Sequence, residues 1–265
     1  MTPLQAAECK SESMAAVFLH CFGGSGKSWA QVSELLGASW HCVTPDLRGF
    51  GDSKSLPEPY TLADAADDVL ALVKSLGLDR YTLVGHSMGG KIAMAIAARQ
   101  PPGLVQLVLL APSPPSPEPI PTEERAQLLA DYLNRAAAEN ATRKSCGKAL
   151  PAALFTQAVD DRLCTSHVAW RWWLEIGSKE DISVDLMPIR VPCQVLVGAS
   201  DINIPASLVQ AEVMPHLQAG KLQIVPGVGH LLPLEAPYVV VQAIIDCAFE
   251  DRRNPQKLGT LLSII

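Results

Sequence analysis

Residues 81–99 read YTLVGHSMGGKIAMAIAAR. The apolar start of this stretch, 81–84, is typical of a buried strand, and residues 87–99 predict a helix. Between them, residues 85–89 are GHSMG, which is the pattern G-x-S-x-G. A serine on a tight turn from strand to helix needs small residues two positions before and after it, and its hydroxyl then projects from the sheet edge. The pattern predicts that Ser87 is a nucleophile rather than an incidental serine at a glycine-rich helix start.

Segments of strand and helix character alternate on both sides of this turn. Helical stretches of about 10 to 15 residues between apolar strands indicate β-α-β units and a parallel sheet. The fold class is therefore α/β, with a mostly parallel central sheet flanked by helices. The expected strands are 15–20, 40–45, 81–84, 104–111, 193–198 and 221–225, and the expected helices are 28–36, 61–77, 87–99, 206–216 and 235–249.

The alternation stops at residues 112–121, PSPPSPEPIP, which contain six prolines. Such a composition fits neither a helix interior nor a central strand. Residues 122–182 then have helical character without a strong strand. The sequence therefore predicts one core, residues 1–111 and 191–265, interrupted by a helical insert at 112–190. The tail 251–265 carries no recognisable chemistry.

The composition excludes several classes of protein. Of 265 residues, 48% are hydrophobic and 18% charged, which is enough apolar material for one large domain. The net charge of -6 disfavours nucleic acid as a partner, because phosphate backbones attract basic surfaces. No apolar run reaches the roughly 18 residues of a membrane span, and residues 1–14 lack the layout of a signal peptide. The seven cysteines are scattered without zinc-ligand spacing, so a reduced, cytoplasmic protein without a metal is expected.

A serine nucleophile requires a base and an acid that orients the base. On this architecture they follow in the order serine, acid, histidine, each beyond a later strand. Asp201 comes directly after VLVGAS (195–200) and is the preferred acid, whereas Glu118 lies in the proline run and is disfavoured. His230 follows the last strand in a glycine-containing loop, so it is the predicted base.

A tetrahedral intermediate needs backbone N–H groups that stabilise its oxyanion. One is expected from the residue after the serine, Met88, and one from the loop after the first strand, HCFGG (20–24). Within that loop we assign the second donor to Phe22.

Five segments of the chain together resemble the α/β-hydrolase superfamily, in particular its lidded serine esterase and lactonase branch. The resemblance implies a sheet of about six to eight strands and a helical lid inserted after the sixth strand of the family pattern. Only about 14 residues precede the first strand here, so six strands or a shortened edge are expected. Cys21 stands where the family usually has glycine, which affects the assignment of Phe22. The matching segments are LHCFGGSGKSW (19–29), PDLRGFGDS (45–53), GHSMGG (85–90), VLVGASDINIP (195–205) and VPGVGHLLPLEAP (225–237).

The resemblance implies hydrolysis of a carboxylic ester or lactone through an acyl-enzyme on Ser87, with no cofactor. The insert carries AWRWWLEIG (169–177), and we assign Trp170 and Trp173 to substrate contact, although core packing is the ordinary role of a tryptophan. An apolar lid favours an apolar acyl chain or an aromatic group in the small-molecule substrate. Related chemistries stay open: C–C bond or thioester hydrolysis, perhydrolysis, synthase-type elimination, or a receptor without turnover.

A second class of protein is suggested by residues 21–28, CFGGSGKS, which nearly match the phosphate-binding pattern G-x-x-x-x-G-K-[ST]. Lys27 and Ser28 would then contact a nucleotide phosphate and its magnesium ion. The first glycine of the pattern is replaced by Cys21, and this interpretation leaves the GHSMG turn, Asp201 and His230 without a role. It is therefore the remote alternative.

Overall fold

A computed structural model describes residues 14–54, 61–184 and 186–252 of the chain. The centre of the molecule is a six-stranded sheet, and all neighbouring strands are parallel, in the order β2-β1-β3-β4-β5-β6. This confirms the predicted fold class. The sheet has six strands, the lower end of the expected range of six to eight. The strands are β1 (Met14–Leu19), β2 (Trp40–Val43), β3 (Tyr81–His86), β4 (Leu104–Leu110), β5 (Cys193–Gly198) and β6 (Gly220–Val225).

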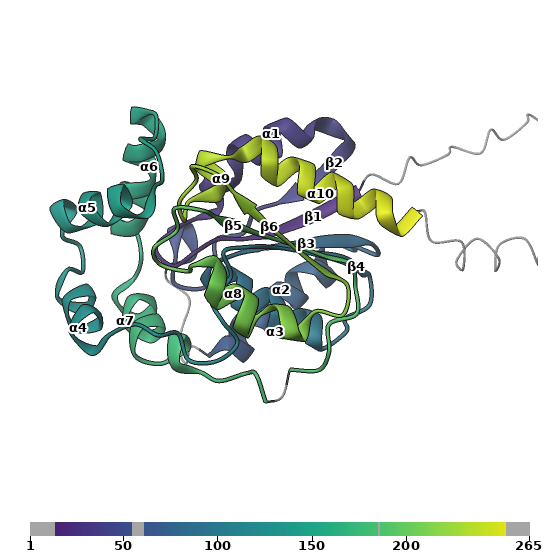
Figure 1. Ribbon diagram of the computed structural model, residues 1–265, viewed down its shortest axis with the longest axis horizontal. Coiled ribbons are helices and arrows are strands. Elements are labelled where there is room, and N and C mark those ends of the chain that lie inside the picture. The colour runs from purple at the N-terminus through teal and green to yellow at the C-terminus, as the bar shows by residue number, and fades with distance from the viewer. Residues whose placement is uncertain (1–13, 55–60, 185, 253–265) are drawn as a thin grey trace, which may run out of the picture.

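Helices cover both faces of the sheet (Figure 1). The helices α1 and α10 pack against each other on one face, with α9 beside them, while α2, α3 and α8 lie on the other. The central strands are therefore buried from both sides, which explains their continuous apolar sequence. The bounds are α1 (Ala30–Leu36), α2 (Leu62–Ser75), α3 (Met88–Ala98), α8 (Ala206–Glu212), α9 (Leu232–Glu235) and α10 (Pro237–Arg252).

Four helices lie between β4 and β5 in the chain, and Figure 1 places them together at one end of the sheet. We call residues 122–175 the four-helix segment. It lies within residues 112–190, for which a helical insert in the core remains a prediction. The helices are α4 (Thr122–Ala130), α5 (Arg135–Ser145), α6 (Ala152–Leu163) and α7 (His167–Glu175).

Element ends differ from the sequence prediction by a few residues, and contacts with another segment of the chain accompany two of the differences. The expected helix 28–36 divides into a 3-10 turn, Gly26–Trp29, and α1. The Asp46 carboxylate accepts a hydrogen bond from the N–H of Gly26, the first residue of that turn, at 2.7 Å. The strand β3 continues to His86, two residues beyond the predicted end, because it stays paired with β4 up to Leu110.

Among the described residues, no helix combines the length and the apolar character that crossing a bilayer requires. The same part of the chain holds no cluster of three side chains suited to a metal ion. The tail 253–265 and the N-terminal residues 1–13 lie outside the described residues.

Candidate active site

Ser87 occupies the turn between β3 and α3, at the carboxyl edge of the sheet. Its backbone has φ 53° and ψ -116°, a left-handed conformation that is uncommon for a residue other than glycine. Its N–H donates to the Leu110 carbonyl at 2.9 Å, which ties the turn to the neighbouring strand. A Cβ atom at Gly89 would lie 2.4 Å from the Leu19 carbonyl oxygen, so only glycine fits there. The predicted strand, turn and helix are thus present around this serine.

Asp201 and His230 come together although 29 residues separate them in the chain. The His230 Nδ1 atom lies 2.7 Å from the Asp201 Oδ2 atom, in a buried contact. The other oxygen of Asp201, Oδ1, accepts from the N–H groups of Asn203 at 2.9 Å and Ile204 at 3.0 Å. With Nδ1–H donating to the carboxylate, the Nε2 atom of His230 is left as the acceptor.

The electrostatics of this pair favour its charged form. Burial alone would lower the pKa of His230, but the charge and the hydrogen bond of Asp201, with contributions from Glu118 and Glu235, raise it above its usual value. For Asp201, burial opposes ionisation, while the attraction of His230 and the hydrogen bonds from His230, Ile204 and Asn203 outweigh it, so its pKa is lowered. The aspartate is therefore ionised whenever the histidine takes up a proton.

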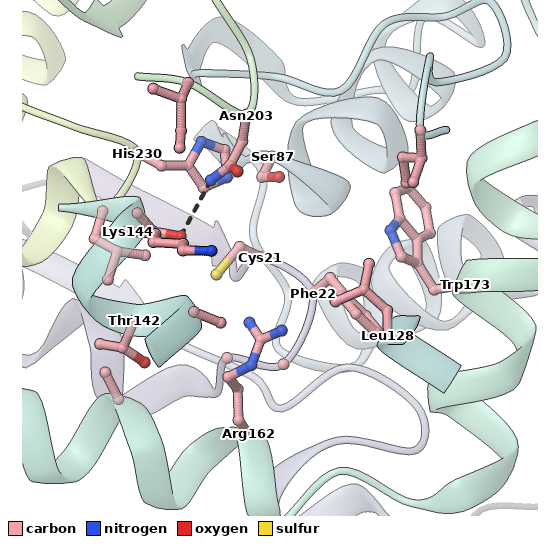
Figure 2. A pocket seen from close by; sticks show the side chains of 18 of the residues that line it. Cys21, Phe22, Ser87, Leu128, Thr142, Lys144, Arg162, Trp173, Asn203 and His230 are labelled. Carbon is pink, nitrogen blue, oxygen red and sulfur yellow. Dashed lines mark hydrogen bonds between the residues drawn. The ribbon is translucent and has the colours of Figure 1, made fainter. Parts of the chain in front are cut away.

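Ser87 and His230 line one cavity of about 700 Å³. Figure 2 shows the Ser87 side chain beside the His230 ring. The residue before Ser87 also contacts the histidine loop, since His86 Nε2 lies 2.8 Å from the His230 carbonyl oxygen. No hydrogen bond joins Ser87 to His230 among the described residues, and such bonds are often long before a substrate binds.

The loop after β1 forms another part of the cavity wall, with Cys21, Phe22 and Gly23. The described residues supply no acceptor for the Phe22 N–H, and Met88, as the first residue of α3, has no partner for its N–H within the helix. Both predicted oxyanion donors are therefore free for a ligand. Cys21, the departure from the family pattern, lines the cavity, and burial raises the pKa of its thiol to about 11, so it is neutral there.

The two tryptophans assigned to substrate contact have different positions. Trp173 lines the cavity. Trp170 lies behind the wall: its ring centroid is 4.6 Å from that of Phe22, and its indole N–H donates to the Leu128 carbonyl at 2.9 Å. Trp170 thus packs in the four-helix segment, which differs from its predicted role, whereas Phe22 presents an aromatic ring that the sequence assigned only through its backbone.

Glu118, the disfavoured acid, also borders the cavity. Its Oε2 atom is buried without a hydrogen-bond partner in the described structure, and burial raises the pKa of its carboxyl group. The histidine's hydrogen bond goes to Asp201 instead. The sequence likewise predicts Asp201, rather than Glu118, as the acid that orients His230.

Glu235, in α9, is a residue of the site that the sequence did not identify. Its buried carboxylate accepts hydrogen bonds from the N–H groups of Gly229 at 3.0 Å and Leu231 at 3.2 Å, on either side of His230. It also accepts from Gly147 at 2.7 Å, beyond the end of α5. One side chain therefore holds the histidine loop against the four-helix segment. Its place in the segment VPGVGHLLPLEAP, five residues after the histidine, was the available signal.

Lys27 and Ser28, the residues of the remote nucleotide-binding alternative, do not form a phosphate-binding site. Lys27 is exposed and is absent from the cavity wall. The Ser28 hydroxyl donates to the Ser25 carbonyl at 2.7 Å, within its own 3-10 turn.

Residues 16–243 match the alpha/beta hydrolase family. A protein of Caulobacter sp. (strain K31), named as a candidate carbamate hydrolase (RutD), is 29% identical over 250 residues, covering 89% of this chain and 91% of the relative. Its namesake from Caulobacter vibrioides (strain NA1000 / CB15N) is 42% identical over 89 residues, which is 33% of either chain.

Among solved structures, an esterase from Exiguobacterium antarcticum superposes with a TM-score of 0.80 at 20% identity, covering 88% of this chain and 91% of the esterase. At this identity the likeness concerns the fold. The family match spans most of the chain and includes the serine turn, Asp201 and His230. The chain belongs to the alpha/beta hydrolase family. The relative from Caulobacter sp. (strain K31), matched along 91% of its length, bears the name of a hydrolase, so a hydrolytic activity is supported.

Proposed function

We propose that this protein is a serine hydrolase that cleaves a carboxylic ester or lactone through an acyl-enzyme on Ser87. The observation that carries the proposal is the buried His230–Asp201 hydrogen bond of 2.7 Å in the wall of the cavity that Ser87 also lines. A nucleophile, a base and an orienting acid are the minimum set for acyl transfer. Residues 112–190 would act as the lid of this site.

In the first half of the reaction, the Ser87 oxygen attacks the substrate carbonyl carbon while His230 Nε2 takes the hydroxyl proton. The carbonyl π electrons move to its oxygen, and the N–H groups of Phe22 and Met88 would stabilise that oxyanion. The intermediate then collapses, the bond to the leaving alcohol breaks, and the proton on His230 goes to the departing oxygen. Asp201 stabilises the imidazolium throughout.

In the second half, water takes the place of the alcohol. His230 accepts a proton from the water as its oxygen attacks the acyl carbon, and the second tetrahedral intermediate releases Ser87 with that proton. For a lactone, the leaving alcohol stays attached to the acyl group, so one hydroxy acid is the product. The proposed chemistry uses these side chains, the two backbone N–H groups and water, and needs no metal ion or cofactor.

The cavity wall supports a substrate with an apolar or aromatic part. Phe22, Leu128 and Trp173 present apolar surface to the cavity. Burial of such a group contributes roughly 25 cal/mol for each Å² of apolar area. Binding energy of this kind orients the carbonyl without taking part in the reaction.

A second candidate is hydrolysis of a carbamate, and the observation that favours it is the similarity to RutD along 89% of the chain. The same steps apply, except that the leaving atom can be nitrogen, to which His230 must deliver its proton. Esters, lactones and carbamates are therefore alternative substrate classes for the same site.

Fluorophosphonate labelling followed by peptide mapping tests the proposal. We expect the label on Ser87, no label in Ser87→Ala, and a loss of kcat of several orders of magnitude in that variant. Exposed Ser75→Ala, on α2, is the matched control and should retain labelling and turnover.

A panel of p-nitrophenyl esters, lactones and carbamates then identifies the bond that is cleaved. The ester and lactone proposal predicts the highest kcat/KM for one of those two classes. A higher value for the carbamates would move the assignment to the second candidate. Labelling at another residue, or no turnover across the panel with unlabelled Ser87, would contradict the serine mechanism.

A further inference from the structure

Arg162, near the end of α6, is a cavity residue that the proposed mechanism does not use. Its side chain lies across the loop after β1, since a Cβ atom at Gly23 would come within 2.9 Å of the Arg162 Cγ atom. Figure 2 shows its guanidinium pointing into the cavity, next to Cys21 and Phe22. A permanent positive charge therefore borders the loop that is expected to hold the oxyanion.

The guanidinium is supported by aromatic rings rather than by a carboxylate. Its central carbon lies 5.9 Å from the centre of the Phe22 ring and 5.3 Å from that of Trp170. Cation–π contacts of this kind hold the guanidinium through the ring faces, so they do not use its N–H groups as hydrogen-bond donors. Within the part of the chain that the structure describes, Arg162 forms no ion pair.

Among the described residues, the acidic side chains of the cavity wall form no ion pair with Arg162. Asp131 is the carboxylate that attracts Arg162, but its Oδ1 atom accepts a hydrogen bond from Gln127 at 3.0 Å. Asp161 interacts with Ser25 and Lys27. Cys21, which also faces the guanidinium, is neutral because burial raises the pKa of its thiol. The remaining charged side chains of the wall are Glu118, Glu124 and Lys144, with His230 as the base.

We propose that Arg162 binds a carboxylate of the substrate, so that the natural substrate is a half-ester or a lactone whose acyl part carries a second, free carboxylate. A guanidinium fork matches a carboxylate with two parallel hydrogen bonds, and such charge-assisted pairs are stronger than neutral ones. The apolar wall then holds the carbon chain between the two carboxyl functions. This inference rests on the proposed function of Ser87 and deepens it.

The test compares monomethyl esters of succinic, glutaric and adipic acid with the corresponding methyl ester amides, in which a primary amide of nearly the same shape replaces the free carboxylate and removes its charge. For the best chain length, the wild type should show a kcat/KM about 10- to 100-fold higher for the carboxylate than for the amide. This ratio should collapse toward one in Arg162→Met. Arg162→Lys, which keeps the charge but loses the fork, should give an intermediate ratio.

The matched control is Arg135→Met, an exposed arginine of the same four-helix segment whose partner is Asp160 at 2.6 Å. It should keep the wild-type ratio. A wild type that hydrolyses both series equally well would overturn the inference and leave the proposed function intact. An equal loss for both series in Arg162→Met would also overturn it, because the arginine would then act on the β1 loop rather than on the substrate.

A binding measurement separates this inference from the mechanism. Calorimetric titration with glutarate should show about tenfold weaker binding to Arg162→Met than to the wild type, and the difference should shrink as salt screens the charge. If no ester is hydrolysed but this difference is found, the proposed function fails and the carboxylate subsite stands. Equal glutarate affinity of the two proteins would contradict the subsite, provided that thermal unfolding shows Arg162→Met to be folded.

Discussion

His230 is subject to two opposing influences on its pKa, and their balance predicts how activity depends on pH. Burial lowers the pKa, while Asp201, Glu118 and Glu235 together raise it above its usual value of 6.5. The base must be neutral to take the Ser87 proton, so a raised pKa moves the onset of activity to higher pH. We expect kcat/KM to rise with pH along a limb whose midpoint lies above 6.5.

The measurement is kcat/KM for one neutral ester between about pH 5 and 9. His20 and His86 cannot produce this limb, because burial lowers their pKa values to about 4 and about 3. A flat profile from about pH 5 to 8 would count against His230 as the base. In Asp201→Asn the remaining activity should have its limb at lower pH, since the principal group that raises the histidine pKa is lost.

Residues whose role depends on their place along a strand could be predicted from the sequence. Ser87 lies between a strand and a helix with glycines two positions away, and Asp201 and His230 each follow a later strand. Arg162 and Glu235 could not be predicted in this way, since their roles come from segments that only folding brings near. Arg162 crosses Gly23, which is 139 positions earlier in the chain than the arginine.

At the level of elements, α9 positions the histidine loop through Glu235. In Glu235→Gln, an amide nitrogen that cannot accept replaces one carboxylate oxygen, so the bond from Leu231 is lost if it replaces Oε1 and the bond from Gly147 is lost if it replaces Oε2. The negative charge that helps to raise the His230 pKa is lost at the same time. We expect a lower kcat and an acid limb of the pH profile that is shifted to lower pH.

The shift of this limb distinguishes positioning of the base from a general loss of stability. Glu34→Gln, an exposed change on α1, is the control and should leave both kcat and the limb in place. A Glu235→Gln variant that unfolds more easily but keeps the wild-type pH profile would show that the carboxylate only stabilises the fold.

The ends of elements were less predictable than their existence, and Asp46 illustrates the reason. Its carboxylate accepts from Gly26 at 2.7 Å and from Asp52 at 2.8 Å, so it joins the loop after β1 to the turn after β2. The first of these bonds holds Gly26, where a 3-10 turn begins ahead of the helix that the sequence predicts from residue 28. Periodicity within one segment holds no information about an acceptor 20 positions away.

At the level of the whole molecule, Lys91 connects α3 to the chain on both sides of the four-helix segment. It is fully buried on α3, and its Nζ atom donates to the carbonyls of Ser116 at 3.1 Å and Glu180 at 2.5 Å. Burial lowers its pKa to about 8, whereas an unfolded lysine titrates near 10.4. Between these two values the unfolded chain binds more protons than the folded protein, so this residue makes stability rise with pH.

Urea unfolding of the wild type and Lys91→Met near pH 7.5 and pH 10 tests this linkage. The free energy of unfolding of the wild type should increase relative to that of the variant as the pH rises, because only the wild type carries the buried amine. Subtracting the variant removes the other titrating groups. If the difference in unfolding free energy between the wild type and the variant is the same at both pH values, Lys91 is protonated equally in the folded and the unfolded chain.

The first described strand, β1, begins and the last described helix, α10, ends on the side of the sheet away from the four-helix segment (Figure 1). The cavity lies between the sheet edge and that segment, since residues of both line it. Anchoring the protein to a solid support next to either of these two positions would therefore keep the support at the end of the sheet opposite the cavity. Such an orientation suits repeated use of the immobilised protein in a flow reactor.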